Sequence, residues 1–156
     1  MLLIGYGNLG RGDDGLGPAF TDRIERRNLP LLKIDTDYQL TVDHALAVAG
    51  AGQVIFADAL IGDSRPFTFT RIEAGVDADL SSHSLTPTGV LSLAATLFGG
   101  SPEAHVLGIS GYEFGEVKEG LSVAAQRNLS LAEAFFVDWY ADTPHGNGGR
   151  EAVADA

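Results

Sequence analysis

Two aspartates and a histidine, far apart in the chain, are the side chains best placed to do chemistry. Asp14 lies in a glycine-rich loop after the first apolar run, Asp58 directly follows the apolar run at residues 54–57, and His83 precedes a predicted helix. Ligand sites in open α/β sheets lie outside the carboxyl ends of the strands, so we expect these three residues to gather there. Two carboxylates and an imidazole supply the oxygen and nitrogen ligands that suit a divalent transition metal. The sequence therefore predicts a metal site made by Asp14, Asp58 and His83.

Each of these side chains also has a purely structural alternative. Asp14 could be a solvated loop acid, Asp58 could cap the turn that follows it, and His83 could be an exposed loop histidine. Pro18 must lie within the first three helical positions, because a later N–H would need a partner that proline lacks. The helix cap then falls between residues 15 and 17, which leaves Asp14 just outside the helix. The other histidines, at positions 44, 105 and 145, have no acidic partner at a motif spacing.

The glycine-rich loop suggests a second kind of site. Residues 5–10 match the pattern G-x-G-x-x-G directly after a first strand, and Asp35 follows at the expected end of the second strand, as in a dinucleotide-binding protein. That pattern must pass straight into a helix whose N-terminus holds the pyrophosphate. Here three further glycines and a proline delay the helix, and Asp13 and Asp14 would repel the phosphates. A dinucleotide enzyme is therefore kept only as an alternative.

Strands and helices are expected to alternate along the chain. The expected strands cover residues 2–4, 31–34, 54–57, 67–72 and 106–109, and the expected helices cover residues 18–27, 40–49, 87–98 and 122–140. Only seven residues, 59–65, separate the third and fourth strands, whereas a parallel crossover needs a dozen or more. The fourth strand is therefore antiparallel and lies nearer an edge. We predict an α/β fold: a three-layer α/β/α sandwich with a five-stranded, mostly parallel mixed sheet.

The composition limits the class of protein. The chain has 156 residues, which is about one domain at roughly 150 residues each, and we expect a single domain over residues 1–141 and a disordered tail over residues 142–156. Its 21 acidic and 10 basic residues give a net charge of −11, which argues against nucleic-acid binding. It has no cysteine, which excludes a disulfide scaffold and a cysteine nucleophile. No basic residue precedes the first apolar run, so we expect no signal peptide. No apolar run reaches the ~20 residues that span a bilayer, so we expect a cytoplasmic protein with no membrane partner.

Three motifs, in this order and spacing, resemble the maturation endopeptidases of nickel–iron hydrogenases across residues 1–140. Gly5-x-Gly7-Asn8 followed by Asp13-Asp14-Gly15-x-Gly17 is similar to their N-terminal signature. Residues 54–59, which include Asp58, are similar to their second motif, and His83 lies where their third motif places its histidine. Tyr6, residues 11–14 and residues 39–41 are similar to the branch that serves bidirectional, NAD-linked hydrogenases.

The resemblance implies a protease that removes a short C-terminal extension from the hydrogenase large-subunit precursor once nickel has been inserted. The family's three metal contacts fall on Asp14, Asp58 and His83, so the metal would be nickel presented by the precursor. A divalent metal could also occupy the site in the isolated protein. Gly7, Asn8 and Asp13 would belong to the loop that faces the substrate. Position 14 is often glutamate in the family, and aspartate is one methylene shorter.

The chemistry of nickel fits these residues. Nickel in the precursor is held by cysteine thiolates, and hard carboxylates and an imidazole can add at its open positions without stripping it. Because this chain has no cysteine, the thiolates must come from the substrate. Either Asp14 or Asp58 activates water while the metal or the loop N–H groups polarise the scissile carbonyl, or the three residues only grip nickel. A non-catalytic nickel-delivery or binding module with the same side chains is the main alternative, and we expect a monomer in each case.

Overall fold

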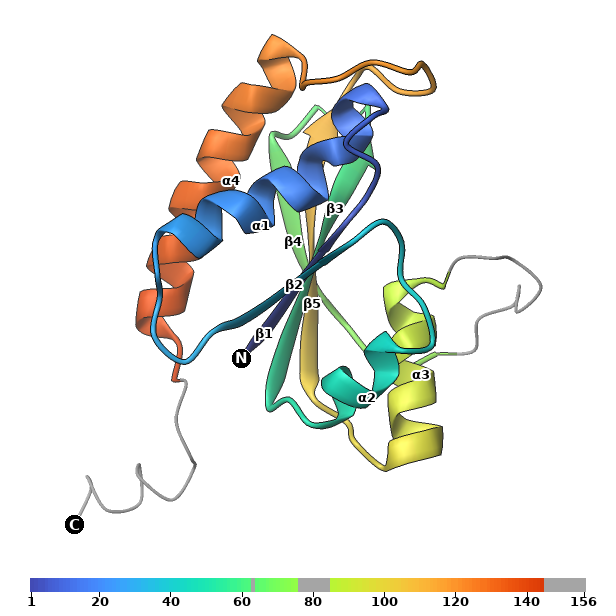
Figure 1. Ribbon diagram of the computed structural model, residues 1–156. Helices are drawn as coiled ribbons and strands as arrows, with labels where there is room; N and C mark the ends of the chain where they lie inside the picture. The colour runs from blue at the N-terminus through green and yellow to red at the C-terminus, as the bar shows by residue number, and fades with distance from the viewer. Residues whose placement is uncertain (63, 76–84, 145–156) are drawn as a thin grey trace.

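The computed structural model describes residues 1–62, 64–75 and 85–144 of the chain (Figure 1). Strands and helices alternate through most of these ranges. The strands are β1 (Leu2–Tyr6), β2 (Lys33–Asp37), β3 (Gln53–Ile61), β4 (Phe67–Ile72) and β5 (Glu103–Gly111). The helices are a 3₁₀ turn η1 (Gly12–Gly15), α1 (Leu16–Arg26), α2 (His44–Ala49), α3 (Pro87–Phe98) and α4 (Val123–Asp142).

The strands form one mixed sheet in the order β2-β1-β3-β5-β4. β1 pairs in parallel with both β2 and β3, and β3 pairs in parallel with β5. β4 is an edge strand and pairs antiparallel with β5, as the short connection before it predicted. The predicted five-stranded, mostly parallel mixed sheet is therefore confirmed.

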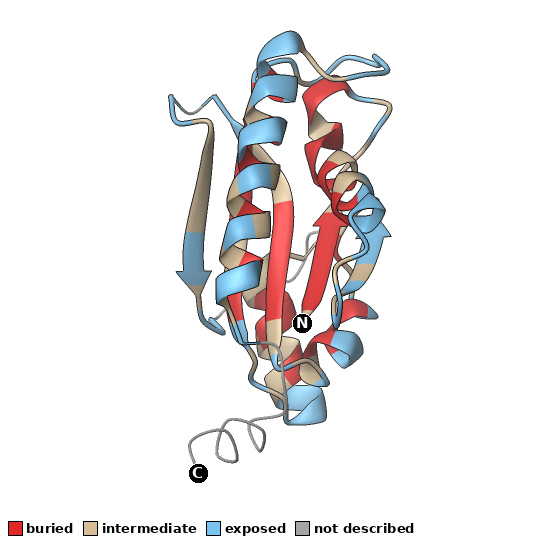
Figure 2. Cartoon of the chain, turned by 90° about the vertical axis from the view of Figure 1, so that its left-hand side faces the viewer, coloured by how far each residue is buried: buried red, intermediate tan, exposed pale blue. Residues whose placement is uncertain are grey.

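Helices cover both faces of this sheet (Figure 1). On one face α1 and α4 pack against side chains such as Leu3, Ile55 and Leu107. On the other face α2 and α3 pack against Ile4, Val54 and Phe56. Figure 2 shows the buried colour concentrated in the central strands and in the helix surfaces that face them. The predicted three-layer α/β/α sandwich is confirmed, and β3 is a continuous apolar run because both its faces are covered.

The predicted boundaries of the second strand and second helix were wrong. The apolar residues Leu31 and Leu32 precede β2, which runs over residues 33–37 and is largely exposed. Its backbone is held by β1 at the edge of the sheet, so its place depends on pairing rather than on apolar content. The second helix begins at His44 rather than at Leu40, although Leu40 is buried.

The first helix begins two residues earlier than predicted, at Leu16, so that Pro18 is its third residue. This agrees with the requirement that proline lie within the first three helical positions. The cap falls on Gly15, within the predicted range, and Asp14 lies just before it. The last helix, predicted over residues 122–140, runs from Val123 to Asp142, and the hydroxyl of Ser122 caps it by accepting the N–H of Ala125.

Gly17 lets α1 approach the sheet closely. A Cβ atom at this position would lie 2.3 Å from the carbonyl oxygen of Tyr6 and 2.7 Å from that of Ala57. These backbone atoms of β1 and β3 cannot move without disturbing the sheet. We expect Gly17→Ala to lower the free energy of unfolding by about 2–3 kcal/mol, as overpacking does elsewhere.

A urea titration followed by circular dichroism measures this effect. Gly52→Ala is the matched control, because a Cβ atom there would have no neighbour within 4 Å. We expect the control to change stability by less than about 0.5 kcal/mol. Equal stability of the two variants would show that the close approach at Gly17 does not limit packing.

A candidate active site at the carboxyl edge of the sheet

Asp58 lies in β3 at the point where its neighbour β1 ends. Ala57 is the last residue of β3 that pairs with β1, opposite Gly5. The prediction that Asp58 lies at the C-terminal end of the strand was wrong, because β3 continues to Ile61 by pairing with β5. The half-buried Asp58 still stands on a rigid element beyond the end of β1. Its Oδ1 accepts the backbone N–H of Ala59 at 2.7 Å, as a local cap would.

Asp14 lies at this edge in the turn η1, which connects the glycine-rich loop to α1. Its Oδ2 accepts the backbone N–H of Asn8 at 2.8 Å. This N–H belongs to the loop that a dinucleotide would need for its phosphates, and it is already paired with a carboxylate. The geometry therefore counts against the dinucleotide alternative.

Asp14 and Asp58 lie close enough for the charge of Asp14 to affect the pKa of Asp58. Burial raises the pKa of Asp58 to about 6, against hydrogen bonds from Ala59 and Tyr6, and the nearby charge of Asp14 raises it further. Burial, followed by the charge of Asp58, raises the pKa of Tyr6 well above its usual value, so the phenol stays protonated. Among the ion pairs between described residues, none joins a basic side chain to either carboxylate. A cation bound between the two carboxylates would therefore relieve an unfavourable charge arrangement.

Gly7 allows the loop and the turn to meet. Its φ angle of 146° lies in a region that side chains rarely adopt, and a Cβ atom would lie 2.0 Å from the carbonyl oxygen of Asp14. No other residue fits this position without moving Asp14. Gly7 therefore places the Asp14 carboxylate by controlling the backbone.

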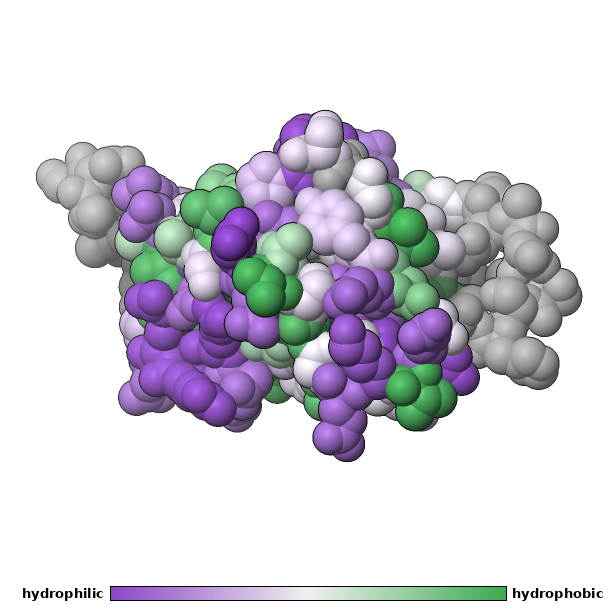
Figure 3. All heavy atoms as spheres, turned by 90° about the horizontal axis from the view of Figure 1, so that it is seen from above, coloured by the Kyte–Doolittle hydropathy of each residue, from purple (hydrophilic) through white to green (hydrophobic). Residues whose placement is uncertain are grey.

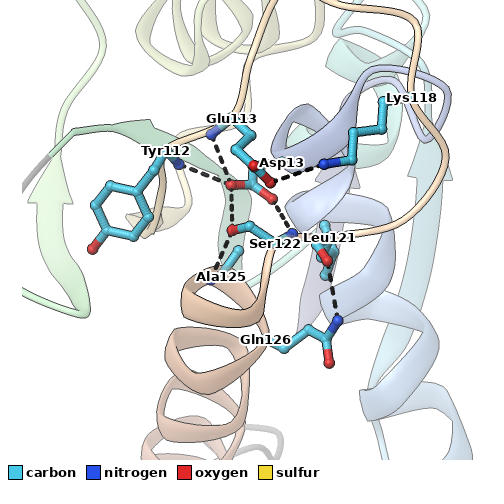
Figure 4. A network of polar contacts seen from close by, with 8 residues as sticks. All are labelled: Asp13, Tyr112, Glu113, Lys118, Leu121, Ser122, Ala125 and Gln126. Carbon is cyan, nitrogen blue, oxygen red and sulfur yellow. Dashed lines mark hydrogen bonds and ion pairs between the residues drawn. The ribbon is translucent and has the colours of Figure 1, made fainter.

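Asp13, unlike the neighbouring Asp14, is fully buried in the protein. Its carboxylate accepts the backbone N–H groups of Tyr112, Glu113 and Ser122 and the hydroxyl of Ser122, at 2.7–3.0 Å (Figure 4). Burial opposes the charge, yet these hydrogen bonds hold the pKa of Asp13 below its usual value. Because every donor comes from the protein, we interpret Asp13 as a residue that positions the loop rather than one that touches substrate.

Asn8 joins the glycine-rich loop to the end of β2. Its side-chain NH₂ donates to the hydroxyl of Tyr38 at 2.6 Å, and its Oδ1 accepts the N–H of Gly10 at 2.9 Å. Beside it lies an open cleft of about 320 Å³, lined by Gly7, Asn8, Leu9, Pro18, Thr36, Asp37 and Tyr38. Seen from above this edge, hydrophobic side chains are scattered among hydrophilic ones (Figure 3). Leu9 and Tyr38 are among the exposed apolar residues.

His83, the third predicted ligand, lies outside the described residues. The described chain resumes at Leu85, whose N–H donates to the carbonyl oxygen of Leu40. Its side chain packs against the α2–α3 core cluster, the buried residues such as Ile4, Val54 and Phe56 that α2 and α3 cover. In the described ranges, no group of three or more His, Cys, Asp or Glu side chains could hold a metal ion. The described part of the predicted ligand set is thus the pair Asp14 and Asp58.

Sequence reasoning missed two polar contacts near this edge. His44 is buried, with its Nε2 3.4 Å from Asp37 Oδ2 and 3.6 Å from Asp35 Oδ2, and its Nδ1 accepts the N–H of Thr41. His44 has no acidic partner at a motif spacing, and the fold instead brings it to Asp35 and Asp37 of β2. The proximity of Tyr6 to Asp58 was also missed, although both residues follow apolar runs of neighbouring strands.

Solved structures of hydrogenase maturation proteases share this fold. The structure aligns with the hydrogenase maturating endopeptidase HybD from E. coli at a TM-score of 0.70 and 17% identity, covering 90% of this chain and 91% of that one. It aligns with a hydrogenase 2 maturation peptidase from Thaumarchaeota archaeon SCGC_AB-539-E09 at a TM-score of 0.66 and 21% identity, covering 89% and 96%.

A sequence relative shows the family. The chain is 30% identical over 144 residues to a Methanocaldococcus jannaschii protein named as a hydrogenase maturation protease, covering 85% of this chain and 90% of the relative. No protein-family model matches the chain. The chain belongs to the hydrogenase maturation proteases, and its class is that of a hydrolase. No helix within residues 1–62, 64–75 and 85–144 is long and apolar enough to cross a membrane.

Proposed function

We propose that this protein is the endopeptidase that removes the C-terminal extension of a nickel-loaded hydrogenase large-subunit precursor. The observation that carries the proposal is the paired arrangement of Asp14 and Asp58 at the carboxyl edge, in a chain that belongs to the maturation proteases. Nickel belongs to the substrate in this account, held by thiolates that this chain cannot supply.

The site would use the metal first for recognition. Asp14 and Asp58 are hard oxygen donors that lie close together, so a divalent ion on the precursor would be attracted to both. His83 would complete the set as a nitrogen donor. A precursor without nickel would make fewer contacts and would not be held in place for cleavage.

The hydrolytic step would be carried by a carboxylate. We favour Asp58 as the group that activates water, because its half-buried position on β3 is rigid and its carboxylate is kept next to a second charge. The precursor's nickel or the N–H groups of the glycine-rich loop would polarise the scissile carbonyl. The N–H of Asn8 is not one of these, because it donates to Asp14.

Mixing the protein with a nickel-loaded precursor and measuring intact mass tests the proposal. We expect the precursor to lose the mass of one C-terminal peptide, with its nickel retained. Transfer of nickel without a change of mass would instead identify a delivery module. A precursor left unchanged in both mass and nickel content would overturn the endopeptidase and the delivery module together.

A further inference from the structure

We propose that Tyr6 is a positioning residue that holds the Asp58 carboxylate in the orientation needed for cleavage. This inference rests on the proposed function, because it assigns a role within the same site. Tyr6 itself would touch neither the substrate nor the water.

The pairing of β1 and β3 places the two side chains together. Gly5 lies opposite Ala57 in this parallel pair, so Tyr6, the last residue of β1, comes next to Asp58. Side chains alternate between the two faces along a strand. Tyr6 follows Ile4 and Asp58 follows Phe56 by two positions, and both apolar residues face α2 and α3. Tyr6 and Asp58 therefore lie on the same face of the sheet, and Tyr6 packs against the α2–α3 core cluster.

Two groups lie at the carboxylate of Asp58. The backbone N–H of Ala59 donates to Oδ1 at 2.7 Å. The phenol of Tyr6 lies near enough to the same carboxylate to affect its pKa, and we infer that it is the second donor. One donor alone would leave the carboxyl group free to rotate about its terminal bond, which is a broad torsion. With both donors present, the carboxylate would keep one orientation beside Asp14, whose charge acts on it.

The ring of Tyr6 is itself held in place. It is half-buried and packed against the core, unlike Tyr38, which is 64% exposed. A donor on a packed ring loses little freedom when it binds, so its position defines that of its acceptor. Removing only the hydroxyl should therefore leave the fold intact and release Asp58.

The test compares Tyr6→Phe with Tyr140→Phe. Tyr140 also donates its hydroxyl, to the carbonyl oxygen of Pro30 between α1 and β2, so the control removes one phenol hydrogen bond away from the proposed site. Two measurements are made on each variant: the side-chain carboxyl ¹³C resonance of Asp58 in the free protein, and kcat and KM for cleavage of the nickel-loaded precursor.

We expect Tyr6→Phe to shift the Asp58 resonance and to lower kcat roughly tenfold or more, with KM unchanged, because misplacement of a reacting group affects the chemical step. Tyr140→Phe should change neither quantity. An unchanged Asp58 resonance in Tyr6→Phe, or an unchanged kcat beside a shifted resonance, would overturn the inference. If the wild type does not cleave the precursor, the proposed function fails, whereas the resonance still decides whether Tyr6 orients Asp58.

Discussion

Asp58→Asn is expected to abolish cleavage of the nickel-loaded precursor, with a loss of about 10³-fold in kcat. Asparagine has nearly the same shape and still accepts the N–H of Ala59, so β3 and its pairing with β5 should be unaffected. It cannot take a proton from water, and it is a weaker ligand than a carboxylate. The measurement is the rate of loss of the C-terminal peptide by intact mass.

The result distinguishes the two hypotheses for the site. If Asp58 activates water, the variant still binds the precursor in a co-sedimentation assay but does not cut it. If the carboxylate only grips nickel, binding and cleavage fall together. Asp138→Asn, an exposed change on α4, is the control and should cut at the wild-type rate. Cleavage by Asp58→Asn at the wild-type rate would remove Asp58 from the site.

Asp13→Asn is expected to lower the free energy of unfolding by about 3 kcal/mol at neutral pH, since it leaves buried donors without a charged acceptor. The carboxylate of Asp13 accepts three backbone N–H groups and the Ser122 hydroxyl, which join η1 to the segment before α4 (Figure 4). An amide would place an NH₂ group against some of these donors.

The stabilisation of the folded protein by Asp13 depends on pH. The pKa of Asp13 is lowered in the folded state, so the unfolded chain takes up a proton first as the pH falls. The stabilisation is therefore fully present above an unfolded pKa of about 3.9 and is lost as the pH falls through the folded value.

Urea titrations of the wild type and Asp13→Asn, at neutral pH and at about pH 3, measure the difference. We expect the gap between the two proteins to narrow at the lower pH. Asp22→Asn, an exposed residue paired with Arg26, is the control and should cost less than about 1 kcal/mol. A gap that stays constant over this range would mean that the charge of Asp13 is not what holds the loop.

Local patterns were sufficient to predict most of the fold. The apolar run at residues 54–57 predicted a strand, and the helix predicted over residues 87–98 matches α3, whose cap is the Thr86 hydroxyl. The short link before β4 predicted its antiparallel direction. In each case the signal was steric or depended on burial of consecutive residues, so the sequence carries it directly.

The predicted strand boundaries were wrong where pairing between strands decides the structure. The polar strand β2 is held by β1, and β3 passes Asp58 because β5 extends beside it. Neither partner can be identified from residues next to these positions. The same holds for the site. The acidic residues near strand ends could be identified in the sequence. The contacts of Tyr6, Asp13 and His44 could not, because they depend on distant segments that the fold brings together.

We propose that the carboxylates at this edge recognise nickel on the precursor before the chain is cut. Two preparations of one large-subunit precursor, identical except for inserted nickel, test it most directly by intact mass after incubation with this protein. We expect only the nickel-loaded precursor to lose its C-terminal peptide. Equal cleavage of both preparations would contradict the claim, because the metal would then play no part in recognition.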